Sequence, residues 1–322
     1  MGGHAARNSA VLARRAFFVL NPGPMTSRHA TAALLCALAA SGTAWALDLH
    51  RERSSPDDLA LTGSLAGVPA GETRYARWSE LRALPTAELK LDGEFVKGPQ
   101  SLTVVFLSDL WKALPVAPGS DTILATCEDG YTSVFTPGFI STYRPFLVLE
   151  INGKGPRDWP PKGLDYNPGP YVITVSAELV PAVARYRDVE HKKPWGVTTL
   201  EVASYADRFK PVFSGVWASL SPATSDGREI WINSCASCHE GPLGIFGGTK
   251  AARPFQVIAA YAAFDRPFFM NYVRDPNSLV PCAKMEPHPH YTDAELDVYK
   301  RQSSTTSVRN SHSVISETWN SA

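Results

Sequence analysis

Hydrophobic and polar residues follow two different patterns along this chain, and the pattern changes between residues 205 and 222. Before that point, short runs rich in β-branched and aromatic residues predict strands. Asp129-Gly130 separates two of these runs and is a strong signal for a β-hairpin. A short helix is expected from about residue 108, with Ser108 as its N-cap. The regions with predicted strands are 102–107, 121–136 (two strands), 146–155, 171–176 and 196–204.

After that point, apolar residues recur at helical spacing. Segments 254–264 and 267–275 each open with proline, which is favoured in the first turn of a helix. Thr292 and Glu295 have the spacing of a capping box, in which two side chains bond each other's backbone N–H groups. This pair predicts the start of a last helix.

The N-terminal residues have the pattern of a secretory signal. From Met25, a polar start with one arginine precedes the apolar run 30–40 and the small-residue pattern Ala44-Trp45-Ala46. That run is too short to span the roughly 30 Å of hydrocarbon in a membrane. We expect residues 1–46 to be upstream residues plus a signal peptide, with Met25 as the true start and cleavage after Ala46. This signal predicts export of the protein to the bacterial periplasm. No stretch of the mature chain is apolar enough to span a membrane.

The remaining chain is expected to be an α+β protein with two domains. A mixed, β-rich domain is predicted over residues 47–212, and an all-α domain over residues 213–297. The total of 322 residues fits two domains at the usual size of roughly 100–200 residues each. Residues 298–322 have neither helical periodicity nor core-forming residues, so we expect a non-native or disordered tail there.

The distribution of charge argues against a nucleic-acid partner. Residues 1–46 contain four arginines and no acidic residue, so the rest of the chain has 27 basic and 31 acidic residues and a net charge of −4. Binding to phosphates requires clustered lysines and arginines. We therefore expect no nucleic acid among the partners.

The segment "INSCASCHE" (232–240) holds the strongest candidate chemistry. Cys235 and Cys238 are one helical turn apart, the spacing that lets two thiols reach the two vinyl groups of a haem, and His239 follows directly. A sixth iron ligand is expected some tens of residues later, and Met285 supplies it. The pattern predicts one haem c, bound covalently through the two cysteines, with the iron between His239 and Met285.

Other interpretations of the same residues stay open. A Cys-x-x-Cys pair is also typical of a redox dithiol, and four cysteines remain in an exported chain after loss of Cys36, which is enough for two disulfides. A zinc site needs four ligands, and the chain has no second cysteine pair. Met270 is the runner-up iron ligand, although its place in the aromatic segment "PFFMNY" favours a core methionine.

Residues 222–297 resemble a class I c-type cytochrome domain. Gly227 and Trp231 occupy the positions of the glycine and aromatic residue in the first helix of that family, ahead of "CASCH". The resemblance implies thioether bonds at the two cysteines, with His239 and Met285 as axial ligands. Two residues depart from the family pattern: Cys282 stands at a position that is usually small, and Glu286 follows the methionine where proline is common.

Two histidines follow the predicted methionine ligand, in "HPHYTD". His288 and His290 are alternative iron ligands or a small metal site. Because they alternate with prolines on a predicted loop, we interpret them as surface residues that shape the methionine loop.

Residues 50–205 resemble the sulfite-oxidase-type molybdopterin-binding domain. The short matching segments are "LSDLWKAL" (107–114), "EDGYTSVF" (128–135), "FLVLEINGKG" (146–155) and "NPGPYVITV" (167–175). In that family, a cysteine thiolate before the "LSDLW"-like helix ligates molybdenum. The corresponding region, 87–105, contains no cysteine, which argues against a molybdopterin cofactor. Cys127 lies elsewhere and alternates with Ile123 and Ala125, which favours a buried structural cysteine.

These features lead to three functional hypotheses. The first is a periplasmic cytochrome that transfers single electrons to redox partner proteins, with the larger domain as a docking or substrate-binding module. The alternative is a haem-containing molybdenum oxidoreductase, similar to sulfite dehydrogenases, that oxidises a small anion and passes the electrons to the haem. The third is a disulfide-stapled binding module without haem. Whether the chain is an enzyme stays open. Residues that are candidates to line an anion pocket are Arg74, Arg77, Tyr143, Arg144 and Trp159.

Overall fold

The computed structural model describes most of the chain between the predicted signal and the predicted tail. The described residues are 46–92, 98–159, 168–210, 222–241, 247–251 and 253–296. The predicted signal peptide and the predicted tail (298–322) lie outside the described residues.

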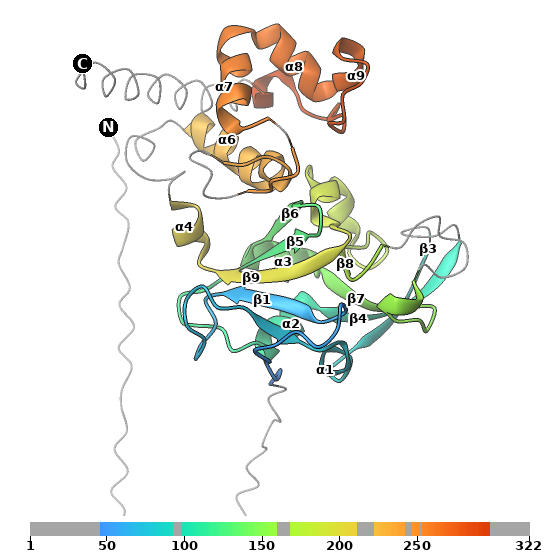
Figure 1. Cartoon of the computed structure of the whole chain (residues 1–322). Helices are drawn as coiled ribbons and strands as arrows, with labels where there is room; N and C mark the ends of the chain where they lie inside the picture. Colours follow the sequence, from blue (N-terminus) through green and yellow to red (C-terminus); the bar gives the residue numbers. More distant parts are fainter. Residues whose placement is uncertain are drawn as a thin grey trace, which may run out of the picture. The chain divides into compact units, whose positions relative to one another are not determined.

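The first β-sheet has five strands in the order β2-β1-β9-β5-β6. Figure 1 labels β1, β9, β5 and β6 of this sheet. β1 and β9 run parallel, while the other neighbours pair antiparallel. The predicted hairpin is confirmed, because β5 and β6 pair on either side of the Asp129-Gly130 turn. The strands are β1 (Leu59–Gly63), β2 (Arg74–Ala76), β5 (Thr122–Cys127), β6 (Thr132–Phe135) and β9 (Val197–Ala203).

The second sheet has four antiparallel strands in the order β3-β4-β7-β8. Both of its faces are buried, since alternate residues of β4 and β7 belong to two different hydrophobic clusters. This explains why "LTVVF" and "FLVL" are continuous apolar runs and show no alternation with polar residues. The strands are β3 (Ala87–Asp92), β4 (Pro99–Phe106), β7 (Phe146–Ile151) and β8 (Val172–Thr174).

The main hydrophobic core includes residues from both sheets. It combines Leu59, Leu61 and Val202 of the first sheet with Leu147 and Leu149 of the second. Short helices complete this part of the chain, and the structure thus confirms a mixed, β-rich fold. They are α1 (Trp78–Arg82), α2 (Leu107–Ala113), α3 (Pro137–Tyr143) and α4 (Tyr205–Arg208), with 3₁₀-helices η1 (Pro156–Asp158), η2 (Pro181–Arg185) and η3 (Val189–Lys192).

The described residues from 222 to 296 contain helices and no strand. Their apolar residues pack on the first sheet, where Leu124, Val134 and Ala203 share a cluster with Trp231 and Phe269. None of the helices in the described ranges is long and apolar enough to cross a membrane. The helices are α6 (Pro222–Asn233), η5 (Cys235–Ser237), α7 (Phe255–Phe264), α8 (Arg266–Arg274) and α9 (Pro276–Leu279).

Two predicted helix starts have different outcomes. The capping box is confirmed, because the backbone N–H of Thr292 donates to Glu295 Oε2 (2.8 Å) and that of Glu295 donates to Thr292 Oγ1 (3.3 Å). The prediction that Ser108 caps the helix after β4 was wrong. That helix begins at Leu107 without a side-chain cap, and the N–H of Leu107 donates to the carbonyl of Pro145 (2.9 Å).

Gly63, the last residue of β1, is required for the packing of the first sheet. Its φ is +85°, and a Cβ at this position would collide with the carbonyl oxygen of Val202 on β9. Gly67 has a similar φ of +75°, but a Cβ there would meet no atom within 4 Å. Substitution of Gly67 measures the cost of the left-handed backbone conformation alone, whereas substitution of Gly63 adds the cost of the collision with Val202.

We expect Gly63→Ala to lower the free energy of unfolding clearly more than Gly67→Ala does. The left-handed conformation alone costs an alanine about 1–2 kcal/mol, and only Gly63→Ala adds a collision with the neighbouring strand. Urea denaturation of both variants measures the difference. Equal losses would show that the contact of β1 with β9 is not tight at this position.

Candidate functional site

The predicted haem-binding motif lies directly after helix α6. The backbone N–H groups of Cys238 and His239 both donate to the carbonyl of Cys235, at 3.2 and 2.9 Å. This hydrogen bonding places Cys235, Cys238 and His239 on one turn of the chain. The structure thus brings together three of the four residues that the sequence predicts for the site.

A hydrogen bond to the backbone orients the imidazole of His239. Its Nδ1 lies 3.1 Å from the carbonyl oxygen of Arg253. A carbonyl only accepts, so Nδ1 carries the hydrogen and Nε2 keeps its lone pair. Burial is the largest influence on the pKa of His239 and lowers it, which favours the neutral ring. A neutral imidazole that donates through one nitrogen to a backbone carbonyl is the usual arrangement of a metal-ligating histidine.

The two thiols of the motif are partly buried. Burial raises the pKa of Cys235 to about 12, and burial also raises the pKa of Cys238. A redox dithiol needs a thiolate of low pKa, so these surroundings disfavour that interpretation. Cys235 and Cys238 are free, as are Cys127 and Cys282, so the described chain contains none of the disulfides that the third hypothesis needs.

Residues 247–251 connect the motif to the hairpin turn of the first sheet. The N–H of Thr249 donates to the carbonyl of Gly130 (3.1 Å), and Lys250 Nζ lies 2.6 Å from Asp129 Oδ2. On the other side, the N–H of Ala251 donates to the carbonyl of Cys238 (2.8 Å). The sequence pattern of Asp129-Gly130 predicts the hairpin turn and gives no sign of this second role.

Met285 lies on the segment that follows α9 and is half-buried. The interactions that relate this segment to the motif belong to its neighbours: Glu286 acts electrostatically on Cys238, and His288 acts on His239. The N–H of His288 also donates to the carbonyl of Val273 on α8 (3.0 Å). The segment that carries Met285, the fourth predicted site residue, is therefore within electrostatic range of the motif.

The other candidate iron ligands have distinct surroundings. Met270 is only 4% exposed and belongs to the hydrophobic cluster of the helical segment, as expected for a core methionine. His288 is not the surface residue that we predicted: its ring centroid lies 5.3 Å from that of His191, and burial lowers its pKa to about 4. His290 is exposed. Among the residues that the structure describes, no group of three or more His, Cys, Asp or Glu side chains is arranged to hold a metal ion.

The segment at and before η3 contributes several polar residues near the motif that the sequence did not single out. Tyr131 Oη and His191 Nδ1 are 2.9 Å apart, and burial lowers the pKa of His191 to about 3. Tyr291 Oη donates to Asp188 Oδ1 (2.5 Å), and Asp188 also acts electrostatically on Cys235. In the sequence, "RDVEHKKPW" has no apolar periodicity and reads as a solvated loop, so no local signal identified these residues.

The residues proposed to line an anion pocket make separate contacts. Arg74 pairs with Glu72 (2.7 Å), Trp159 Nε1 donates to the carbonyl of Lys154 (2.6 Å), and the guanidinium of Arg144 lies 4.5 Å from the ring centre of Phe106. These contacts are on different elements. They give no support to an anion site.

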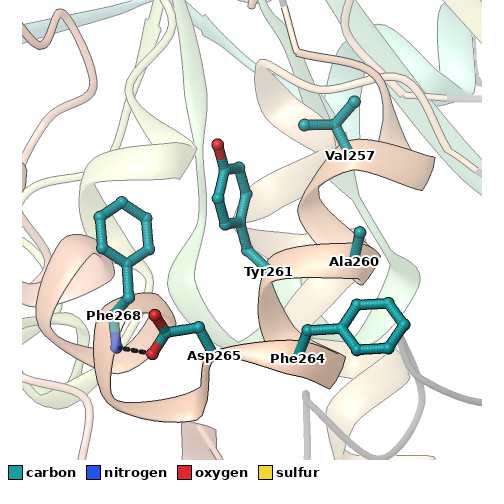
Figure 2. A pocket seen from close by; sticks show the side chains of 6 residues that line it. All are labelled: Val257, Ala260, Tyr261, Phe264, Asp265 and Phe268. Atoms are coloured by element: carbon teal, nitrogen blue, oxygen red, sulfur yellow. Dashed lines mark hydrogen bonds between the residues drawn. The ribbon is translucent and has the colours of Figure 1, made fainter.

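A hollow of about 590 Å³ lies between α7 and α8 (Figure 2). Its lining is mostly apolar, and its carboxylate is already used: Asp265 Oδ1 accepts from the N–H of Phe268 (3.0 Å) and caps α8. The hollow therefore offers apolar contact surface and no evident catalytic group. Its lining residues are Val257, Ala260, Tyr261, Phe264, Asp265 and Phe268.

Comparisons with known proteins leave the family open. No family model matches the chain, and no curated protein sequence matches it. One solved structure to which it is similar is the sulfane dehydrogenase SoxCD from Paracoccus pantotrophus, with 14% sequence identity and a TM-score of 0.31. The matched region covers 49% of this chain and 42% of the SoxCD chain. This protein therefore spans less than half of the length of that chain. A likeness at this level carries no argument about fold or activity.

Proposed function

We propose that this protein binds one haem c and transfers single electrons. Cys235 and Cys238 form the thioether bonds, and His239 and Met285 are the axial ligands. The observation that supports the proposal most directly is the hydrogen bond from His239 Nδ1 to the carbonyl of Arg253. It leaves Nε2 available for iron and fixes the orientation of the ring.

Each residue has a defined task in this proposal. One turn of chain carries the two thiols that would add to the vinyl groups, while Trp231 lies beside the motif with its ring centroid 6.4 Å from that of His239. A haem with histidine and methionine ligands has a raised potential and no open coordination position, so it supplies single-electron transfer when bound. The protein contributes the ligands, their orientation and the exclusion of water.

The β-rich part serves, in this proposal, as a docking or substrate-binding module. Its residues do not fit a molybdenum site of the sulfite-oxidase type. Cys127 is the sole cysteine between residues 47 and 212, and it packs in the main core with Ile123 and Ala125. Burial raises the pKa of its thiol to about 12, whereas metal ligation needs the thiolate. We therefore assign no step to molybdenum.

The setting of the proposed activity is the periplasm. Covalent attachment of haem and export through the predicted signal peptide are consistent with each other. The donors and acceptors are then redox partner proteins of that compartment, each exchanging one electron at a time. The alternative, a molybdenum oxidoreductase that delivers electrons to the haem, differs in its metal content.

Purified mature protein should contain close to one equivalent of iron and no molybdenum. The physical reason is that one Cys-x-x-Cys-His motif binds one haem, and the β-rich part offers no accessible thiolate. Elemental analysis of protein expressed with periplasmic haem attachment measures both metals. Molybdenum near one equivalent would establish the alternative, and absence of iron would refute the haem proposal.

Met285→Leu should keep the covalent haem but lower its reduction potential, because the thioether ligand is lost. Axial ligands set haem potentials over a range of about 0.8 V, so the change should be large. Met270→Leu is the matched control, since it replaces a buried core methionine at similar volume and should leave the potential unchanged. Potentiometric titration compares the two variants. An unchanged potential in Met285→Leu rules out Met285 as the ligand.

Thiol counting tests covalent attachment independently of colour. Denatured mature protein should react with an alkylating reagent at Cys127 and Cys282 only, because the other two sulfurs are in thioether bonds. In the folded state Cys282 is exposed and should react quickly, whereas Cys127 is buried and should be protected. Mass spectrometry of the alkylated protein counts the sites, and four reactive thiols after denaturation would contradict the assignment.

A further inference from the structure

Lys192, at the end of η3, has a buried side chain beside the proposed haem site. Only 1% of its surface is exposed. Its Nζ donates to the carbonyl of Val134 on β6 (2.5 Å) and to Oδ1 of Asn233 (3.0 Å). Asn233 is the last residue of α6, two positions before Cys235. The lysine thus joins the first sheet to the helix that leads into the motif.

The rest of its surroundings is aromatic. Nζ lies 5.9 Å from the ring centre of Phe135 and 5.4 Å from that of Phe139, distances at which a ring face attracts a cation. The elements that carry these rings, β6 and α3, contain no charged residue. Such an environment replaces only part of the hydration that an ammonium group loses on burial.

Charged and titratable groups reach Lys192 from its own element, η3, and from α6. Asp188, at the start of η3, and Glu229, on α6, both favour the protonated amine. His191, the preceding residue, interacts with Lys192 unfavourably when both are protonated. Asp188 is also within electrostatic range of Cys235. One carboxylate therefore acts both on the lysine and on a cysteine of the motif.

Burial brings the pKa of Lys192 into a different range from the pKa values of His191 and His288. Burial lowers the pKa of Lys192 to about 7, in spite of the two carboxylates. Burial lowers the pKa of His191 to about 3 and that of His288 to about 4, so both rings are neutral above pH 5. A change in charge between pH 6 and pH 8 at this place is thus assigned to the lysine.

We propose that Lys192 binds a proton when the haem is reduced and releases it when the haem is oxidised. This inference rests on the proposed function, since it needs the haem at Cys235 and Cys238. Oxidised haem has one positive charge more than reduced haem, and two like charges in a poorly hydrated environment repel each other. Reduction removes that repulsion and favours the ammonium form.

The step is balanced by one electron and one proton. A one-electron donor protein supplies the electron to the iron, the solvent supplies the proton, and the amine of Lys192 becomes an ammonium group. Oxidation by an acceptor protein reverses both transfers. Around the pKa of the lysine, the reduction potential then falls as the pH rises. The slope of this fall corresponds to at most one proton taken up per electron.

The contacts of Lys192 suit both charge states. A neutral amine has two N–H groups, and the structure offers two acceptors, the carbonyl of Val134 and Oδ1 of Asn233. Loss of the third proton therefore leaves both hydrogen bonds in place. The charge near the motif can therefore change without a rearrangement of the packing around it. Lys192 holds Asn233 in place in both charge states and acts on the haem through its charge.

The test is a potentiometric titration of the haem protein between pH 5 and pH 9. In the unmodified protein, the potential should fall through a transition near pH 7. Lys192→Met should abolish this transition and hold the potential near the alkaline value, because the charge is absent at every pH. Lys192→Arg should abolish it as well, but hold the potential near the acidic value, because the charge is permanent. A purely structural role of Lys192 does not produce two opposite plateaus.

Two further variants keep the test decisive if a change at the buried lysine prevents folding. Glu229→Gln removes a carboxylate that favours the protonated amine, so it should move the transition to lower pH. Lys112→Met is the matched control: it removes an exposed lysine whose side chain is 73% accessible, and the transition should stay where it is. A transition at the same pH in Glu229→Gln as in the unmodified protein would overturn the assignment to Lys192.

Failure of the two proposals can be told apart. If no haem is attached covalently, the absorption spectrum shows it and both proposals fall. If haem is attached and the potential does not change between pH 6 and pH 8, or still changes in Lys192→Met, the proposed function stands and the role of Lys192 is refuted.

Discussion

The outer face of the first sheet has to be buried, and this constraint fixes where the proposed haem-binding motif lies. Strand β5 directs Ile123, Ala125 and Cys127 into the main core, so Leu124 points to the opposite side. There it packs with Val134 of β6 and with Trp231 of α6. Covering this apolar face places the end of α6, and therefore the turn from Cys235 to His239, against the β-rich part of the chain.

Polar contacts surround this apolar contact and give it a defined register. Asp129 pairs with Lys250, Asp188 accepts from Tyr291, and Arg187 Nη1 lies 2.8 Å from Glu295 Oε1. Exposed ion pairs contribute little stability, typically below about 1 kcal/mol, so hydrophobic burial remains the main stabilising term. The buried bond between Tyr291 and Asp188 is different, because loss of either partner leaves a desolvated polar group behind.

The sequence predicted local structure well where the signal depends on neighbouring residues. The hairpin around Gly130, the capping box at Thr292 and the burial of Cys127 all follow from spacing within a few residues, and the structure confirms them. The prediction for Ser108 failed because a tertiary hydrogen bond from Leu107 to Pro145 replaces the expected cap. Propensity gives way where tertiary contacts satisfy the same backbone groups.

The surroundings of the motif could not be predicted in the same way, because they depend on residues distant in sequence. Lys192 is 41 positions from Asn233, and the sequence around it is rich in charge. Such a segment is normally solvated, and only the fold shows that this lysine is enclosed by two aromatic rings. In the proposed function, the motif specifies which group is bound. The charges proposed to act on that group come from the β-rich part, so a separated helical segment would lose Asp188 and Lys192 together with the apolar face that covers Trp231.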